Sequence, residues 1–217
     1  MHIPDGLLAP QTYLPAFALA APLWLHATRK LRGTLDETLL PRLAVFTALA
    51  FLLSSLMVPL PGGTSTHAVG VALMALVLGP WTAFLAYTLV LVVQALLVGA
   101  GGITALAANA LLMGFVGAWT AVILHRWLHP LHGDAATGVA VWVSVVLSAT
   151  LMATLLGVQP LIAQDETGSP LYFPFGLTVT LPAVVLPHML LAIGEAVLTL
   201  LILRHARHRG WMEARAL

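Results

Sequence analysis

Long apolar runs joined by short polar connections restrict the fold of this sequence more than any other feature. Of its 217 residues, 60% are hydrophobic and only 8% are charged, whereas a soluble domain carries about 25% charged residues. Such a chain has too little polar surface to remain in water, so its solvent is a lipid bilayer. We expect residues 1–217 to form a single all-α, polytopic transmembrane domain.

The apolar runs predict about seven transmembrane helices, since each needs roughly 20 residues. We place them at 12–28, 42–59, 67–79, 80–98, 104–125, 137–157 and 181–203. The third is short and meets Gly79-Pro80, so a re-entrant segment is its alternative. Counting it as a span puts all nine Lys and Arg residues on one side, as the positive-inside rule favours. The N-terminus is then outside, and residues 204–217 form a cytoplasmic tail.

The absence of several residue patterns excludes some function classes. Without cysteine there is neither a disulfide framework nor a thiolate metal site. A net charge of +1 is too balanced to indicate a nucleic-acid partner. The sequence also lacks GxxxxGK[ST], HExxH and GxSxG, the common motifs of nucleotide hydrolysis, zinc proteases and serine hydrolases. We therefore expect no catalytic residues and no ATPase site in this chain.

The first ten residues, MHIPDGLLAP, have the composition of a constrained segment. The α-amine of Met1, together with the amide and imidazole nitrogens of His2, can close fused chelate rings around one metal ion. Pro4 restricts the residue before it to extended conformations, and Asp5-Gly6 favours a turn back toward the body of the protein. Tetragonal nitrogen coordination favours Ni(II) or Cu(II). Residues 1–10 are therefore predicted to bind metal, the alternative being that His2 is an ordinary residue near a start codon.

His67 is the natural fourth nitrogen donor. It ends the loop PGGTSTH on the same external face and precedes an apolar segment. Alternatively, His67 only marks the membrane interface, or Ser65 or Thr66 caps the following helix. A ligating histidine needs its second ring nitrogen held by an acceptor, for which Asp5, Thr64 and Ser65 are candidates.

Among the polar residues within the apolar segments, four are predicted to form an intramembrane network: Gln94, Asn109, His188 and Glu195. His188 and Glu195 are seven residues apart and share one face of the last helix. Ionisable groups inside a membrane are costly and usually face a bundle interior or a cavity. A structural or coupling role is one interpretation; a simple buried contact with Gln94 or Asn109 is the other.

Five motifs in sequence order give this chain a resemblance to a known family: MHIPDG, PGGTSTH, GPWTAFLAYTLVLVVQALL, GGITALAANALLMGFVG and HMLLAIGEAVLT. It resembles the CbiM/NikM family, the substrate-capture membrane subunits of energy-coupling-factor transporters for cobalt and nickel. The resemblance implies that Met1, His2 and His67 supply the metal ligands. The chain departs from the family pattern at Ala100, where an acidic residue is common, and at Pro187 before His188.

The resemblance also implies partners and a location. The family's subunits work in the prokaryotic cytoplasmic membrane with a membrane-embedded T subunit and a pair of cytoplasmic ATPases, often with a small accessory membrane subunit. The metal ion is then the transported substrate, and no prosthetic group is expected. A planar four-nitrogen site suits Ni(II) better than Co(II).

The expected function is high-affinity capture of Ni(II) or Co(II) outside the cell and uptake across the membrane. The alternative is a divalent-metal channel or secondary carrier that needs no partner, which predicts a continuous polar path across the spans. A membrane hydrolase built on His188 and Glu195 ranks last, because it lacks a ligand set of familiar spacing.

Overall fold

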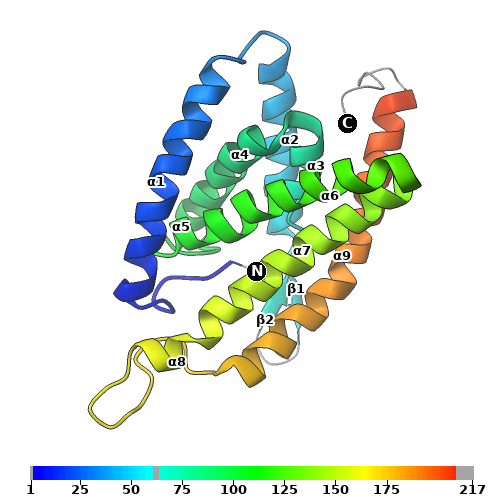
Figure 1. The fold of residues 1–217 in the computed structure, drawn as a ribbon. Coiled ribbons are helices and arrows are strands. Elements are labelled where there is room, and N and C mark those ends of the chain that lie inside the picture. Colours follow the sequence, from blue (N-terminus) through cyan, green and yellow to red (C-terminus); the bar gives the residue numbers. More distant parts are fainter. Residues whose placement is uncertain (1, 61–63, 209–217) are drawn as a thin grey trace.

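Helices form most of the protein (Figure 1). The computed structural model describes residues 2–60 and 64–208, without the side chains of 58–60, 64–65 and 131–132. In chain order the elements are α1 (Pro10–Arg32), α2 (Leu39–Ser55), β1 (Val58–Leu60), β2 (Thr64–Thr66), α3 (Val71–Leu78), α4 (Pro80–Val93), the π-helical turn η1 (Gln94–Val98), α5 (Leu106–Asn109), the π-helical segment η2 (Ala110–Val116), α6 (Gly117–His132), α7 (Asp134–Gly157), α8 (Gln159–Ile162) and α9 (Leu177–His208).

The described part of the chain contains four helical stretches that are long and apolar enough to cross a bilayer. These are Pro80–Val98, Leu106–Pro130, Asp134–Ile162 and Leu177–His208, and α2 is a shorter apolar helix. The 23-residue α1 is also long enough at about 1.5 Å per residue, but it ends in the basic residues Arg29, Lys30 and Arg32. The prediction of a helical membrane protein is confirmed. One antiparallel hairpin, β1–β2, interrupts the helical pattern.

The segment expected to be the third span is different from its neighbours. Only Val71–Leu78 is helical, and eight residues reach about 12 Å, well short of a bilayer core of about 30 Å. The helix begins beside Glu195, about halfway along α9. Its other end, with Gly79 and Pro80, lies beside residues 122–126 in the middle of α6. The segment 67–79 therefore crosses the molecule as an extended stretch followed by a half-length helix.

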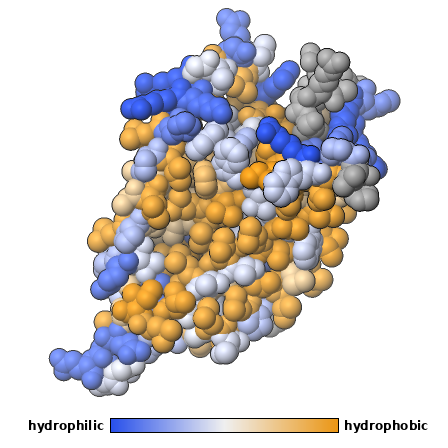
Figure 2. Space-filling model, viewed as in Figure 1, coloured by the Kyte–Doolittle hydropathy of each residue, from blue (hydrophilic) through white to orange (hydrophobic). Residues whose placement is uncertain are grey.

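The connections between helices collect at two ends of the bundle. Figure 1 places the hairpin, the loop before α5 and the connection around α8 at one end. The α1–α2 connection, the α6–α7 junction and the end of α9 lie at the other. Figure 2 shows a broad hydrophobic band between hydrophilic ends. The last turns of α1 and α9 both carry basic residues, so we call the second end the basic end.

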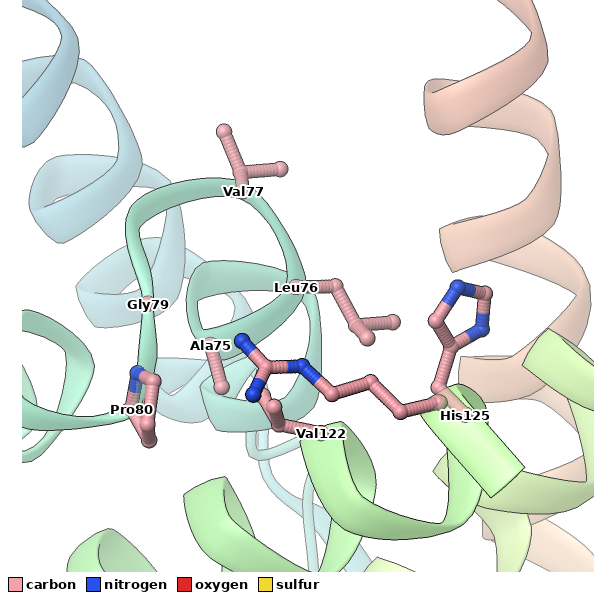
Figure 3. Close-up of a pocket in the computed structure, with 8 residues that line it drawn as sticks. Ala75, Leu76, Val77, Gly79, Pro80, Val122 and His125 are labelled. Carbon is pink, nitrogen blue, oxygen red and sulfur yellow. The ribbon is translucent and has the colours of Figure 1, made fainter. Parts of the chain in front are cut away.

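A cavity of about 90 Å³ lies at the basic end between α3 and α6 (Figure 3). It is lined by residues 75–77, 79–80, 122, 125 and 126. Neither His2 nor His67 is among these residues.

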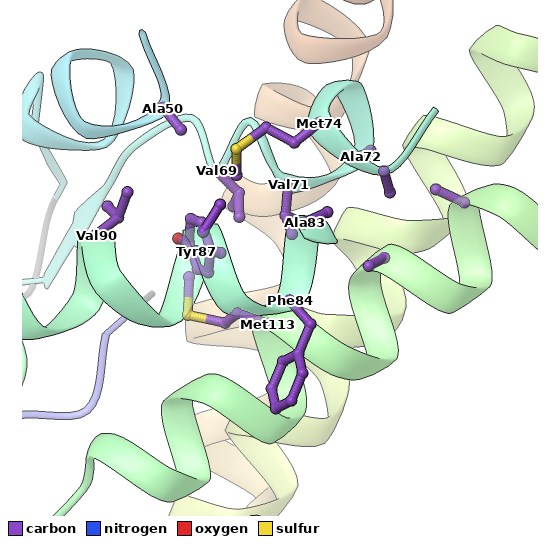
Figure 4. Packing of buried hydrophobic residues seen from close by; sticks show 14 of the residues in the cluster. Ala50, Val69, Val71, Ala72, Met74, Ala83, Phe84, Tyr87, Val90 and Met113 are labelled. Carbon is purple, nitrogen blue, oxygen red and sulfur yellow. The ribbon is translucent and has the colours of Figure 1, made fainter. Parts of the chain in front are cut away.

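The core is built around α3 and α4 (Figure 4). Phe84 and Tyr87 of α4 and Met113 of η2 are fully buried and pack with the side chains of α3. Gly117 lets α6 approach both α3 and α7, because a Cβ there would lie 3.0 Å from Val71 and 3.2 Å from the Ser148 hydroxyl. A small residue at this position thus allows close helix approach within the bundle.

Candidate metal centre

The N-terminal segment is held inside the bundle by Asn109. The amide nitrogen of Ile3 donates to the Asn109 Oδ1 at 3.0 Å, and the Asn109 Nδ2 donates to the Ile3 carbonyl at 3.0 Å. Ile3 is 0% exposed, so both of its backbone groups need a protein partner. One amide side chain satisfies both groups, as a neighbouring strand would, and thereby fixes the position of His2.

The turn that follows docks on the loop before α5. The Asp5 carboxylate accepts hydrogen bonds from the amides of Ile103 at 3.1 Å and Thr104 at 2.8 Å, and from the Thr104 hydroxyl. The Thr104 hydroxyl and these amides hold the Asp5 pKa below its usual range. Gly102 lies so close that a Cβ would be 2.4 Å from the Asp5 nitrogen. The predicted Asp5-Gly6 turn is present, with Gly6 at a φ of +82°.

A third anchor, Gln159, was missed by the sequence analysis. Its Oε1 accepts from the amide of Ala9 at 3.0 Å, and its Nε2 donates to the Leu155 carbonyl at 2.8 Å. The Thr12 hydroxyl also contacts both side-chain ends of Gln159. The only signal in the sequence is an uncharged polar residue placed directly after a long apolar helix. Gln159 fixes the point where the N-terminal segment joins α1.

These anchors bring His2 against His67. The two imidazole ring centroids are 4.5 Å apart, with an angle of 31° between the ring planes. Metal–nitrogen bonds are about 2 Å long, so two imidazoles this close are within reach of one metal ion after small rotations. The hydroxyl of Tyr87, a buried residue of α4, lies 3.5 Å from the His2 Nε2. Met1, the third predicted ligand, lies outside the described residues.

Both imidazoles are held in the neutral form. Burial lowers the pKa of His67 to about 3. Burial also lowers the pKa of His2 well below its usual range, and the neighbouring His67 ring adds to the effect. Metal binding requires the deprotonated ring, so the surroundings favour the form of each side chain that can ligate at neutral pH.

A backbone carbonyl lies beside the second ring nitrogen of His67. The His67 Nδ1 lies 3.0 Å from the Ala68 carbonyl, so a backbone oxygen holds the second ring nitrogen. The contacts of Asp5 described above are with residues 103 and 104. The side chains of Thr64 and Ser65 lie outside the described residues.

Each of the four predicted intramembrane polar residues is buried and has its own partners. Asn109 binds Ile3, as described above, and the Gln94 Nε2 donates to the Ser54 hydroxyl at 2.8 Å. His188 contacts Thr66 at 3.2 Å, and Glu195 accepts from two backbone amides at the start of α3. Three of the four therefore support the segments that carry His2 and His67, and Gln94 links α2 to the end of α4.

Comparison with known proteins identifies the family. The model of CbiM, described as the cobalt uptake substrate-specific transmembrane region, matches residues 2–211. The chain belongs to the CbiM family. The predicted family resemblance is thus confirmed, and the segments around His2 and His67 that carried it are the ones that meet in the fold.

Relatives of known description are transport proteins. The chain is 39% identical to a probable fused nickel transport protein of Lactiplantibacillus plantarum, over 95% of this chain and 64% of that protein. It is 38% identical to a fused nickel transport protein of Rhodobacter capsulatus, over 88% of this chain and 57% of that one. The chain thus spans less than two thirds of either fused protein. A putative metal transport protein of Methanocaldococcus jannaschii is 36% identical, with 88% and 84% covered.

Solved structures share the fold. A crystal structure of a transition metal transporter superposes with a TM-score of 0.92 at 37% identity, covering 98% of this chain and 95% of that one. A truncated transition metal transporter gives a TM-score of 0.91 at 38% identity, covering 96% and 99%. Membership of the CbiM family therefore extends to the arrangement of the helices as well as the sequence.

Proposed function

We propose that this CbiM-family chain captures Ni(II) or Co(II) at the external face of the membrane and is the substrate-specificity subunit of an ATP-driven energy-coupling-factor transporter. The proposed ligands are the amine of Met1, the amide and imidazole nitrogens of His2, and the imidazole of His67. The observation that carries the proposal is the approach of the His2 and His67 rings to 4.5 Å. They come from segments 65 residues apart, and both are held in the neutral form.

The fold supports an orientation with the N-terminal segment outside. The basic last turns of α1 and α9 lie at the end of the bundle opposite the hairpin and the α8 connection. Basic residues favour the cytoplasmic side, where paired ATPases would act. A membrane-embedded T subunit and, in some systems, a small accessory membrane subunit complete the proposed transporter in the prokaryotic cytoplasmic membrane.

Nickel is the preferred cargo in this proposal. A planar site with four nitrogens, one of them a deprotonated amide, suits Ni(II) better than Co(II). The names of the fused relatives from Lactiplantibacillus plantarum and Rhodobacter capsulatus both specify nickel. Cu(II) binds such donors more tightly still, so selectivity in the cell depends partly on metal supply.

The decisive experiment changes the chelate geometry and leaves every side chain present. Ni(II) and Co(II) binding is measured for the purified chain, for a variant with one alanine inserted between Met1 and His2, and for His67→Ala. The exposed His208 provides a matched control as His208→Ala. We expect the first two variants to lose high-affinity binding and the control to retain it. Normal binding by the insertion variant would remove the N-terminal segment from the ligand set.

The transport role needs a separate measurement. Cells that express this chain alone are compared with cells that also express the T subunit and the ATPases, and uptake of radioactive Ni(II) is followed over time. The proposal predicts ATP-dependent uptake only when the ATPases are present. Equal uptake in both strains would favour the partner-independent channel or carrier.

A further inference from the structure

Helix α9 holds the chain on both sides of His67. Before it, the His188 Nε2 lies 3.2 Å from the Thr66 hydroxyl. After it, the two Glu195 carboxylate oxygens accept hydrogen bonds from the amides of Val69 at 2.9 Å and Gly70 at 2.7 Å. The side chain of the residue before His67 and the backbone two and three residues after it are therefore held by a single helix.

The position of Glu195 explains why a carboxylate is present in the bundle interior. Glu195 is only 4% exposed, and an ionisable group buried in a membrane bundle needs a specific partner. Val69 and Gly70 directly precede α3, and the first amides of a helix have no acceptor within it. A carboxylate at this end also interacts favourably with the helix dipole. The Glu195 carboxylate has two acceptor oxygens, one for each amide, whereas a neutral amide side chain has only one.

The direction of the His188 contact follows from its second nitrogen. The His188 Nδ1 lies 2.7 Å from the Val184 carbonyl, one turn earlier in α9. A carbonyl only accepts, so Nδ1 carries the proton and Nε2 is the acceptor. In the neutral ring, the Thr66 hydroxyl therefore donates to the His188 Nε2.

Gly70 adds a steric limit to the polar ones. It has a φ of +73°, and a Cβ there would lie 3.4 Å from both the Cα and the Cβ of Ala50 in α2. The segment from Thr66 to Gly70 is thus confined between α2 on one side and α9 on the other. The His67 ring is fixed in turn by its contact with the Ala68 carbonyl.

We propose that His188 and Glu195 are positioning residues for His67, so that the last helix sets the coordination geometry of the captured metal ion. This inference rests on the proposed function, in which His67 is a ligand. Neither residue touches the metal. They act through the backbone and through Thr66, and the prediction is that disturbing them changes how the metal is bound and not only how stable the protein is.

The test uses the full chain in detergent with Ni(II) as the probe. Glu195→Gln removes one of the two amide acceptors, and Thr66→Val removes the hydroxyl that meets His188 with little change in shape. Trp142→Phe is the matched control. It deletes the hydrogen bond from the Trp142 Nε1 to the Met189 carbonyl at 3.0 Å, which also holds α9 but does not involve residues 66–70. The readouts are the visible absorption of bound Ni(II), its release rate into a chelator, and the unfolding temperature.

We expect Glu195→Gln and Thr66→Val to weaken Ni(II) binding by about 10- to 100-fold, the usual effect of losing a group that orients a ligand, and to alter the absorption band. Glu195→Asp, which keeps both acceptor oxygens, should restore part of the affinity. Trp142→Phe should lower the unfolding temperature and leave affinity and spectrum unchanged.

The inference is overturned when Glu195→Gln and Thr66→Val lower the unfolding temperature, as Trp142→Phe does, but bind Ni(II) with normal affinity and a normal absorption spectrum. Thr66→Val keeps the test decisive when Glu195→Gln does not fold. Failure of the proposed function has a different signature, because the unmodified chain and the alanine-insertion variant then bind Ni(II) equally. If the alanine insertion abolishes Ni(II) binding but Glu195→Gln and Thr66→Val bind Ni(II) normally, only the role of α9 is refuted.

Discussion

Replacing Asn109 by leucine is the sharpest test of how the N-terminal segment is held. Leucine has a similar shape but neither donates nor accepts, so the amide and the carbonyl of Ile3 lose their partners in a site that is 0% exposed. Each unsatisfied buried group costs about 1–3 kcal/mol, or roughly 2–6 kcal/mol for the pair.

Undocking of the N-terminal segment limits the free-energy cost of these unsatisfied groups. The segment can leave the bundle and hydrate its backbone, at which point it gives up the burial of the Ile3 side chain, worth about 1.5–3 kcal/mol. We therefore expect the docked state to lose about 2–3 kcal/mol. At 1.4 kcal/mol per factor of ten, the apparent Ni(II) affinity falls by roughly 30- to 150-fold.

The assay is competition for Ni(II) against a calibrated chelator at fixed pH. Ser144→Ala is the matched control, because it deletes a buried bond to the Gly117 carbonyl at 2.7 Å, away from the N-terminal segment. Affinity within twofold of wild type for Asn109→Leu, in a protein that remains folded, would refute the argument that Asn109 docks the metal-binding segment.

Three further predictions concern other contacts of the fold. Gly102→Ala should displace the Asp5 turn and weaken Ni(II) binding at least tenfold, whereas Gly176→Ala, with open space around its Cβ, should have no effect in the same titration. The metal-free protein should lose stability as the pH falls from about 6.5 toward 3, because the unfolded chain protonates His67 while the folded chain does not; thermal unfolding of His67→Gln should be less sensitive to pH over this range. Asp134→Asn weakens two partly exposed ion pairs to α9 and should cost less than about 1 kcal/mol in denaturant unfolding, with Ni(II) binding unchanged.

The hydropathy of the sequence was enough to predict where most helices lie. It failed at residues 67–79, where an apolar average suggested a full helix but only Val71–Leu78 is helical. The helix begins where it does because Glu195 accepts the amides that precede it. That acceptor lies 125 and 126 residues further along the chain, so no local pattern could reveal the boundary.

The meeting of His2 and His67 was predictable, since both belong to short polar segments assigned to one face and nitrogen chemistry links them. The groups that hold them were only partly predictable. A buried Asn109 has to bind something, but its partner, Ile3, is 106 residues away. Tyr87 and Gln159 gave no comparable signal. The sequence indicates which polar residues are buried, and only the fold determines their partners.

The anchoring of the N-terminal segment also orders the steps of biogenesis. Residues 2–9 are made well before their partners: Asn109 lies 106 residues after Ile3, and Gln159 lies 150 residues after Ala9. Docking cannot be completed until α8, which carries Gln159, has been synthesised. A segment made before most of the helices is thus among the last parts of the bundle to reach its final place. A chain truncated before Gln159 would keep the contacts of Asn109 with Ile3 and of Thr104 with Asp5 but would lack the anchor where the N-terminal segment joins α1.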